Sequence, residues 1–377
     1  MIEKLIYLIR KRRRQMKTSI KDIRIYSAVS TLSKPIADAT HDISKISFYV
    51  LEVELESGVT GQGYLLSFHY SPNAIEGALK DVRNFVLNGG YQVHETVRVK
   101  QDWDKEAEYF GINGVQNCAI AALNIAMWDA KGKTMGQPIW KLFGSNMKKI
   151  PVYGSGGWIS YSDQELLDEV LDYQKRGFTA VKVKVGHPDG IERDIARLRM
   201  CREKLGDKTR IMMDANQGMD VPTALALAKQ AREIGLQWFE EPISKDNHAG
   251  YQLLRNQCGI AIACGEREYD CQSLKELIKR NAIDMWQPDL VRMGGVETWR
   301  DSIALANAYD IPALPHYYKD YDVPLLCTVP KVYGAESFDW INAIIDNTMR
   351  IENGYAYPRE TPGWGFSFKE EYLTPVK

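Results

Sequence analysis

IMMD (residues 211–214), LQWFE (236–240) and IAIACGE (260–266) are three short apolar runs, and each of them ends in a carboxylate. Three later runs end in an acid or an imidazole: DMWQPD at Asp289, IPALPH at His316 and VYGAE at Glu336. The closing residues are 20 to 27 positions apart, which is the length of a strand, a loop, a helix and a return. The pattern predicts parallel strands with helical crossovers, whose carboxyl ends converge on one face of a (β/α) barrel.

A single acid after a strand is more often a turn residue or a helix cap than a functional group. Six such residues in one register make that explanation poor for the whole set. We therefore treat all six as candidate site residues.

The composition is that of an ordinary globular protein. The 377 residues are 45% hydrophobic and 26% charged, with a net charge of −1, which gives no reason to expect nucleic acid or an anionic membrane as a partner. No apolar run reaches the roughly 18 residues of a membrane span. The six cysteines show neither paired spacing nor a zinc pattern, so we expect reduced thiols and a cytoplasmic protein.

The chain changes character along its length. Its first part reads as strands followed by helices, which is an α+β arrangement, whereas strand and helix alternate later. A basic run near the start of the chain suits a solvated or oligomer-contact helix better than a membrane or nucleic-acid contact. We predict an N-terminal extension at 1–15, an α+β capping domain at 16–148, a barrel catalytic domain at 149–350, and a segment at 351–377 that returns to the capping domain.

Asp214, Glu240 and Glu266 are predicted to point into one pocket. Three carboxylates at close range cannot all stay ionised without a cation between them. Ligation by oxygen alone suits a hard divalent ion, and Mg²⁺ is favoured because water or substrate oxygens can complete its octahedron. The alternative is that each acid pairs with a lysine or arginine.

Lys182 and Lys184 lie in the strand-like run AVKVKVG at 180–186, and a period of two sends both side chains to the same face. We expect that face to point into the barrel, where lysine is rare without a function. Two adjacent ammonium groups lower each other's pKa, so one can act as a neutral base near pH 7. An exposed edge strand is the alternative, and the intervening valines argue against it.

His316 and Asp289 close neighbouring strands, so we expect a hydrogen bond between them that fixes the imidazole tautomer and raises its basicity. Glu336 closes the last strand, and in its protonated form it could donate to a developing enolate oxygen. Taken alone, a histidine is more often structural, but its place in the register favours a functional role.

The motifs VKVKVG, MDANQ, WFEEP, GE and QPD, followed by a strand-end histidine and a late glutamate, resemble the mandelate racemase subgroup of the enolase superfamily. The resemblance covers nearly the whole chain after Met16. It implies an α/β fold, in which an α+β N-terminal capping domain covers a modified (β/α)7β TIM barrel. The Lys-or-His base with Mg²⁺ is the known chemistry of this superfamily.

Specific roles follow from the same resemblance. It implies one Mg²⁺ on the three carboxylates, Lys184 as one base, and the His316–Asp289 pair on the opposite face. It also implies that the substrate is contacted by Lys182, Asn216 and Glu336. The shared reaction is removal of the proton α to a carboxylate.

The loop KPIADATHDISK at 34–45 should determine specificity, and Asp38, Thr40, His41 and Asp42 make it polar. The run YYKDYD after His316 is also polar and aromatic. These residues suit the hydroxyl groups of a sugar chain, so Asp38 and His41 are candidate substrate-binding residues, although simple solvent exposure explains the polarity equally well. PIADA and GSGGW also resemble acid-sugar dehydratases that act on hexarates such as galactarate or talarate.

We expect a lyase that dehydrates a hexarate or hexonate to a 2-keto-3-deoxy acid and that forms a homo-oligomer, from dimer to octamer. A racemase, epimerase or cycloisomerase using the same two bases is the alternative enzyme. A non-catalytic binder of sugar acids is a third possibility, but such a binder has no need of two bases.

Overall fold

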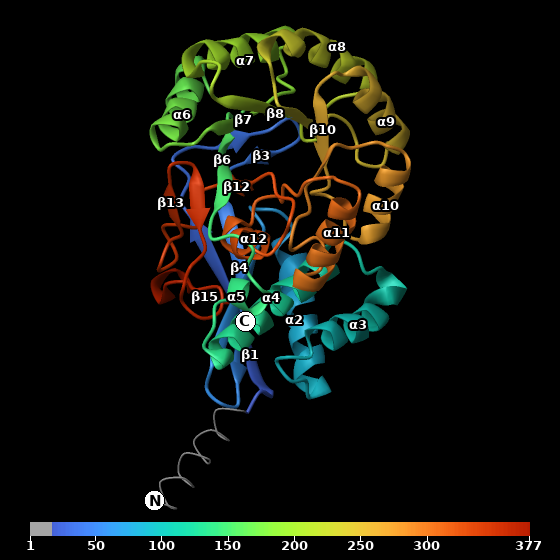
Figure 1. Ribbon diagram of the computed structural model, residues 1–377. Coiled ribbons are helices and arrows are strands. Elements are labelled where there is room, and N and C mark those ends of the chain that lie inside the picture. Colours follow the sequence, from blue (N-terminus) through green and yellow to red (C-terminus); the bar gives the residue numbers. More distant parts are fainter. Residues whose placement is uncertain (1–16) are drawn as a thin grey trace, which may run out of the picture.

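The computed structural model describes residues 17–377, and it divides into a smaller α+β part and a barrel (Figure 1). The predicted extension at 1–15 lies outside the described residues. No helix in the described part of the chain is long and apolar enough to cross a membrane.

The smaller part is built on an antiparallel sheet with the order β15-β1-β4-β5. Buried and partly exposed residues alternate toward both ends of β4, whereas residues 48–51 in its middle are all buried. The strands are β1 (Ile20–Ser30), β4 (Ile46–Leu55), β5 (Thr60–Leu66) and β15 (Thr374–Pro375). The helices are α2 (Pro72–Gly89), α3 (Thr96–Ala107), α4 (Val115–Met135) and α5 (Ile139–Leu142), with a 3₁₀ turn at Glu108–Phe110.

Helix α4 approaches the sheet so closely that two positions of β5 require glycine. A Cβ atom added to Gly63 would lie 2.2 Å from the carbonyl oxygen of Ala122, and one added to Gly61 would lie 2.3 Å from that of Ala126. Both obstacles are helix backbone, which cannot move aside as a flexible side chain can. The glycines therefore set the distance between helix and sheet.

The barrel strands are parallel and follow one another around the sheet, and β12 pairs with β6. They are β6 (Ile150–Gly156), β7 (Ala180–Lys184), β8 (Arg210–Asp214), β9 (Trp238–Glu240), β10 (Ala261–Cys264), β11 (Met285–Trp286) and β12 (Ala335–Ser337). The predicted strand ending at His316 forms only isolated bridges, with Ala313 paired to Trp286 and to Val332. These bridges fill the place between β11 and β12.

Helices between these strands form an arc around the outside of the barrel (Figure 1). They are α6 (Asp163–Lys175), α7 (Ile191–Leu205), α8 (Val221–Ala231), α9 (His248–Gln257), α10 (Cys271–Lys279) and α11 (Val296–Ala308), with a 3₁₀ turn at Arg232–Ile234. The last helix, α12 (Lys319–Leu326), is buried along its whole length and lies near the centre of the view (Figure 1). Helix α6 begins with a capping box, in which the Ser162 side chain accepts from the Glu165 backbone and the Glu165 side chain accepts in return. The predicted modified (β/α)7β TIM barrel with its α+β N-terminal cap is confirmed.

The last segment of the chain contacts both parts. The hairpin β13 (Arg350–Glu352) and β14 (Tyr355–Tyr357) joins the barrel through β6, whereas β15, after a 3₁₀ turn at Glu370–Tyr372, joins β1. The domain boundaries given above remain predictions.

Residues 34–45, expected to be a loop, contain a short hairpin of β2 (Ile36–Ala37) and β3 (Asp42–Ile43). The hairpin lies against the barrel loops, because the Ile159 backbone donates to the Ala37 carbonyl at 2.9 Å.

Candidate active site

The candidate residues lie one layer above the floor of the barrel. The floor consists of inward-facing core side chains from successive strands: Tyr153, Ala180, Met212, Trp238, Ala263, Met285 and Leu314. Side chains two positions farther along a strand face the same way. Lys182, Asp214, Glu240 and His316 each follow a floor residue by two positions, so packing of the floor aims them into the barrel.

A cavity of about 140 Å³ opens above this layer, between the barrel and the capping domain. Among the predicted residues, those that line it are Lys184, Asn216, Glu266, His316, Glu336, Asp38 and His41. The cavity lining does not include four other predicted residues, all of which are buried: Lys182, Asp214, Glu240 and Asp289.

Lys182 joins three carboxylates at the centre of the barrel. Its Nζ lies 2.7 Å from Glu336 Oε1 and 3.3 Å from Asp214 Oδ2, and it also pairs with Glu240. The neighbouring Lys184 Nζ lies 2.5 Å from Asp214 Oδ2. Both lysines are almost fully buried on a strand that lies between β6 and β8, so the alternative of an exposed edge strand is wrong.

The expected low lysine pKa is not found. Burial lowers the pKa of Lys184, but the carboxylates of Asp214, Glu240 and Asp38 together outweigh burial and the repulsion of Lys182, so the net pKa lies above the ordinary lysine value. The sequence argument considered the two ammonium groups and overlooked how closely Asp214 would pair with one of them.

Each of the three predicted metal ligands lies beside positively charged side chains in this structure. Glu266 interacts with His316 Nε2 and Arg267 Nη2, each at 3.6 Å, whereas the other two acids pair with the lysines. Within residues 17–377, no group of three acids, histidines or cysteines is gathered as a metal site. The alternative in which each acid pairs with a lysine or arginine is therefore the arrangement seen.

The donor set nevertheless fits a hard divalent cation. Burial raises the pKa of Glu240 to about 8, and the nearby charges of Asp214, Glu336 and Glu266 add to this against the effect of Lys182. The buried lysine thus leaves negative charge around Glu240 uncompensated. Carboxylate oxygens in such a setting suit Mg²⁺.

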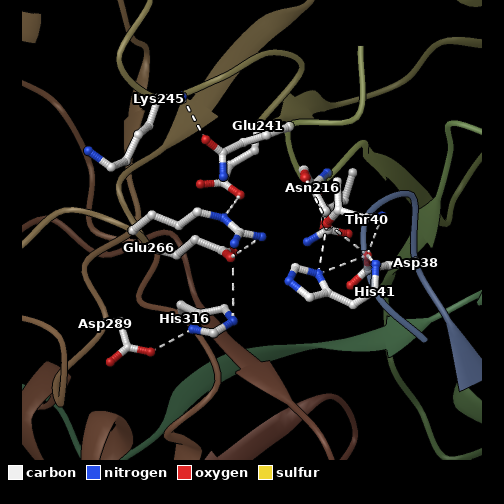
Figure 2. A network of polar contacts seen from close by, with 12 residues as sticks. Asp38, Thr40, His41, Asn216, Glu241, Lys245, Glu266, Asp289 and His316 are labelled. Atoms are coloured by element: carbon white, nitrogen blue, oxygen red, sulfur yellow. Dashed lines mark hydrogen bonds and ion pairs between the residues drawn. The ribbon is translucent and has the colours of Figure 1, made fainter. Parts of the chain in front are cut away.

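His316 and Asp289 form the predicted pair, with 2.7 Å between Nδ1 and Oδ2 (Figure 2). The other oxygen of Asp289 accepts from the backbone of Val291 at 2.9 Å and of Arg292 at 2.8 Å, which fixes the carboxylate. Burial lowers the pKa of His316, but Glu266 and the Asp289 hydrogen bond raise it above its ordinary value. The imidazole is therefore biased toward its charged form.

Glu336 is not in the protonated form that it would need in order to donate a hydrogen bond. Burial raises its pKa, but Lys182 and His316 outweigh burial and hold the net pKa below the ordinary value. Its Oε2 accepts from the Tyr317 backbone at 2.9 Å. Glu336 is consequently a carboxylate here, with a fixed orientation.

Asp38 and His41, the two candidate substrate-binding residues of the hairpin, line the cavity. Asp38 Oδ1 accepts from the backbones of Thr40 and His41, both at 2.8 Å, and Thr40 Oγ1 donates to the Asn216 carbonyl at 3.2 Å (Figure 2). Asn216 has a φ of 42°, and its side-chain oxygen is buried without a hydrogen-bond partner. Asn216 is also one of the residues that line the cavity.

The run YYKDYD contributes less than expected. Only Tyr317 lines the cavity, because α12 turns the following residues into the protein interior. Sequence reasoning missed two groups of cavity residues: Arg267 and Arg292, close to predicted site residues, and an aromatic wall of Phe68, Tyr70, Trp158, Phe338 and Trp340.

Comparison with known proteins identifies two matching family models. Residues 20–144 match the N-terminal domain of mandelate racemase / muconate lactonizing enzyme, and residues 165–372 match the enolase C-terminal domain-like family.

Two curated relatives align over most of their length. L-talarate/galactarate dehydratase of Salmonella typhimurium is 27% identical over 93% of this chain and 89% of its own. The 3,6-anhydro-α-L-galactonate cycloisomerase of Streptomyces coelicolor is 30% identical over 90% of this chain and 94% of its own.

Two solved structures of similar proteins superpose on nearly the whole chain. A racemase from Streptomyces coelicolor with bound magnesium superposes with a TM-score of 0.90 at 27% identity, covering 94% of this chain and all of the other (100%). The Salmonella typhimurium L-talarate/galactarate dehydratase with Mg and L-lyxarohydroxamate gives 0.88 at 26% identity, covering 94% of this chain and 93% of the other.

Proposed function

The chain belongs to the mandelate racemase / muconate lactonizing enzyme family of the enolase superfamily, and from this premise we propose that it is a Mg²⁺-dependent acid-sugar dehydratase. The observation that carries the proposal is that Lys184 and His316 line one cavity from strands on different sides of the barrel. Two proton-transfer groups around one cavity suit abstraction of a proton and departure of a hydroxyl group.

Mg²⁺ would be held by Asp214, Glu240 and Glu266. When bound, it supplies positive charge that makes the proton α to a substrate carboxylate more acidic. The support for this ligand set is its chemistry: buried carboxylate oxygens that the lysines do not fully neutralise.

Lys184 would remove the α-proton. Its Nζ must first lose the proton that Asp214 now stabilises at 2.5 Å. Engagement of Asp214 by the cation would weaken that stabilisation, and burial would then favour the neutral amine.

His316 would act as the acid. Its Nδ1 proton is directed to Asp289, so Nε2 is left to donate to the departing C3 hydroxyl. Elimination across the two groups is anti, and the enol product tautomerises to a 2-keto-3-deoxy acid.

Lys182 and Glu336 would stabilise the enediolate. Lys182 is a buried cation beneath the cavity, and Glu336 lines the cavity. Glu336 contacts a substrate carboxylate favourably only after it gains a proton, because two carboxylates repel. Asn216, Asp38 and His41 would hold hydroxyl groups.

A racemase, epimerase or cycloisomerase is the second candidate. The 30% identity with a cycloisomerase over 90% of this chain favours it specifically. The same two groups would then remove and return protons without loss of water. A non-catalytic binder is disfavoured, because binding alone does not explain both Lys184 and the His316–Asp289 pair.

The test is a screen of mono- and diacid sugars with Mg²⁺, in which 2-keto acids are detected with semicarbazide. We expect at least one substrate to give a 2-keto-3-deoxy acid, and the Lys184→Ala variant to give none at the same enzyme concentration. Epimers or lactones without any 2-keto acid would instead support the second candidate.

A further inference from the structure

The cavity has two chemically different arcs. Strands β7 to β11 and the segment at His316 supply charged and amide side chains, whereas the loops after β6 and β12 supply aromatic rings, and β12 itself supplies Glu336. Because β12 pairs with β6, the rings of Trp158, Phe338 and Trp340 come from adjacent positions on the barrel rim. Phe68 and Tyr70 extend this aromatic wall from the capping domain.

The rings hold one another in place. Phe338 and Trp340 stack with centroids 4.4 Å apart and planes at 20°, and Trp158 stacks on Trp340 at 5.9 Å and 26°. Phe68 meets Trp340 edge-on at 5.8 Å. Such pairs are favourable geometries for aromatic side chains, so the wall is an ordered surface.

The aromatic wall extends from Lys184 toward the hairpin of β2 and β3. Lys184 Nζ lies 5.4 Å from the centroid of the Trp158 ring, and Tyr70 lies 5.8 Å from the ring of His41. A substrate whose α-carbon lies beside Lys184 therefore extends its remaining carbons along aromatic faces.

Cations near the polar arc are already paired with acids. Arg267 Nε lies 2.8 Å from Glu241 Oε2, and Arg292 Nη1 lies 3.8 Å from Glu266 Oε1. A second carboxylate in this cavity would lose water of hydration and face the negative side of aromatic rings. A carbon-bound hydrogen in the same place would bury apolar surface instead.

We propose, resting on the dehydratase function above, that the substrate is a monocarboxylic sugar acid whose distal end is apolar. The ligand chemistry with this property is the terminal methyl group of a 6-deoxyaldonate, which keeps the C3 hydroxyl that the proposed elimination expels as water. The aromatic wall recognises that end, while Asp38, His41 and Asn216 bind hydroxyl groups nearer the carboxylate.

The experiment compares kcat/KM for 6-deoxyaldonates with that for aldarates of matched stereochemistry. We expect at least a tenfold preference for the 6-deoxyaldonates, the scale on which hydrophobic pockets discriminate. Trp340, which is half-buried, provides the variants. Trp340→Arg should shift the ratio toward the aldarate by about tenfold, because it adds a cation, whereas Trp340→Phe should keep the wild-type ratio.

Calorimetric titration of the Lys184→Ala variant with the same acids gives a second readout that needs no turnover. Tighter binding of the distally apolar acids supports the proposal, and equal or tighter binding of aldarates overturns it. Dehydration of aldarates in preference to 6-deoxyaldonates overturns this proposal and leaves the dehydratase function intact. Absence of any 2-keto acid rejects the dehydratase function itself, and the calorimetric comparison then still decides which distal end the cavity prefers.

Discussion

Replacing Asp289 with asparagine should move the pH dependence of turnover. Asp289 Oδ1 accepts two backbone hydrogen bonds and Oδ2 accepts from His316 at 2.7 Å. An asparagine that keeps the backbone bonds must direct its NH₂ group at Nδ1 of the imidazole. The charged imidazole then loses its acceptor and meets a donor.

The magnitude follows from that single bond. Hydrogen bonds to charged groups contribute about 1.5–3 kcal/mol, and one pKa unit corresponds to about 1.4 kcal/mol. The pKa of His316, raised in the native protein, should therefore fall by about 1–2 units. Since the proposed acid must be protonated, activity is lost as pH rises through this pKa, and the loss should begin at lower pH in the variant.

The assay is the pH profile of kcat with the best acid sugar found. We expect the alkaline limb to move down by about 1–2 units and turnover at pH 8 to fall by about tenfold or more. Asp310→Asn, an exposed surface change far from His316 in the fold, is the matched control and should leave the profile unchanged. An alkaline limb that stays in place in Asp289→Asn would refute the role assigned to the pair.

Three further results are expected. Chelation followed by dialysis should abolish turnover and Mg²⁺ should restore it, whereas full activity in excess chelator, measured by the same assay, would exclude the metal. Glu240→Gln should abolish turnover. The metal-free wild-type protein should lose stability in urea as the pH rises from about 4.5 to 8, because the pKa of Glu240 is raised to about 8 in the folded state, which therefore favours the protonated acid. The variant should lose less stability over that range, and an unchanged pH dependence would contradict the raised pKa. Gly63→Val should destabilise the protein by about 1–3 kcal/mol in urea titrations, since its Cβ would lie 2.2 Å from helix backbone, and wild-type stability would show that α4 can move away.

The period-two register explains why much of the site could be predicted from the sequence. Asp214 and Glu240 follow buried floor residues by two positions, so their direction depends only on strand geometry and on the packing of Met212 and Trp238. The pairing of Asp289 with His316 was likewise predictable, because the two residues close neighbouring strands.

Other features depend on tertiary contacts that no local pattern encodes. The raised pKa of Lys184 and the ionised state of Glu336 arise from ion pairs between strands. Part of the aromatic wall comes from the loops after β6 and β12, where Trp158 and Trp340 meet only once the barrel closes. The run YYKDYD was misjudged because helix α12 buries most of it.

The central claim is that proton removal by Lys184 and hydroxyl departure assisted by His316 together dehydrate an acid sugar. Proton NMR of the reaction in D₂O tests it most directly. The account predicts a 2-keto-3-deoxy acid with deuterium at C3. Substrate that gains deuterium at C2, or is converted to an epimer, without any 2-keto acid would contradict it.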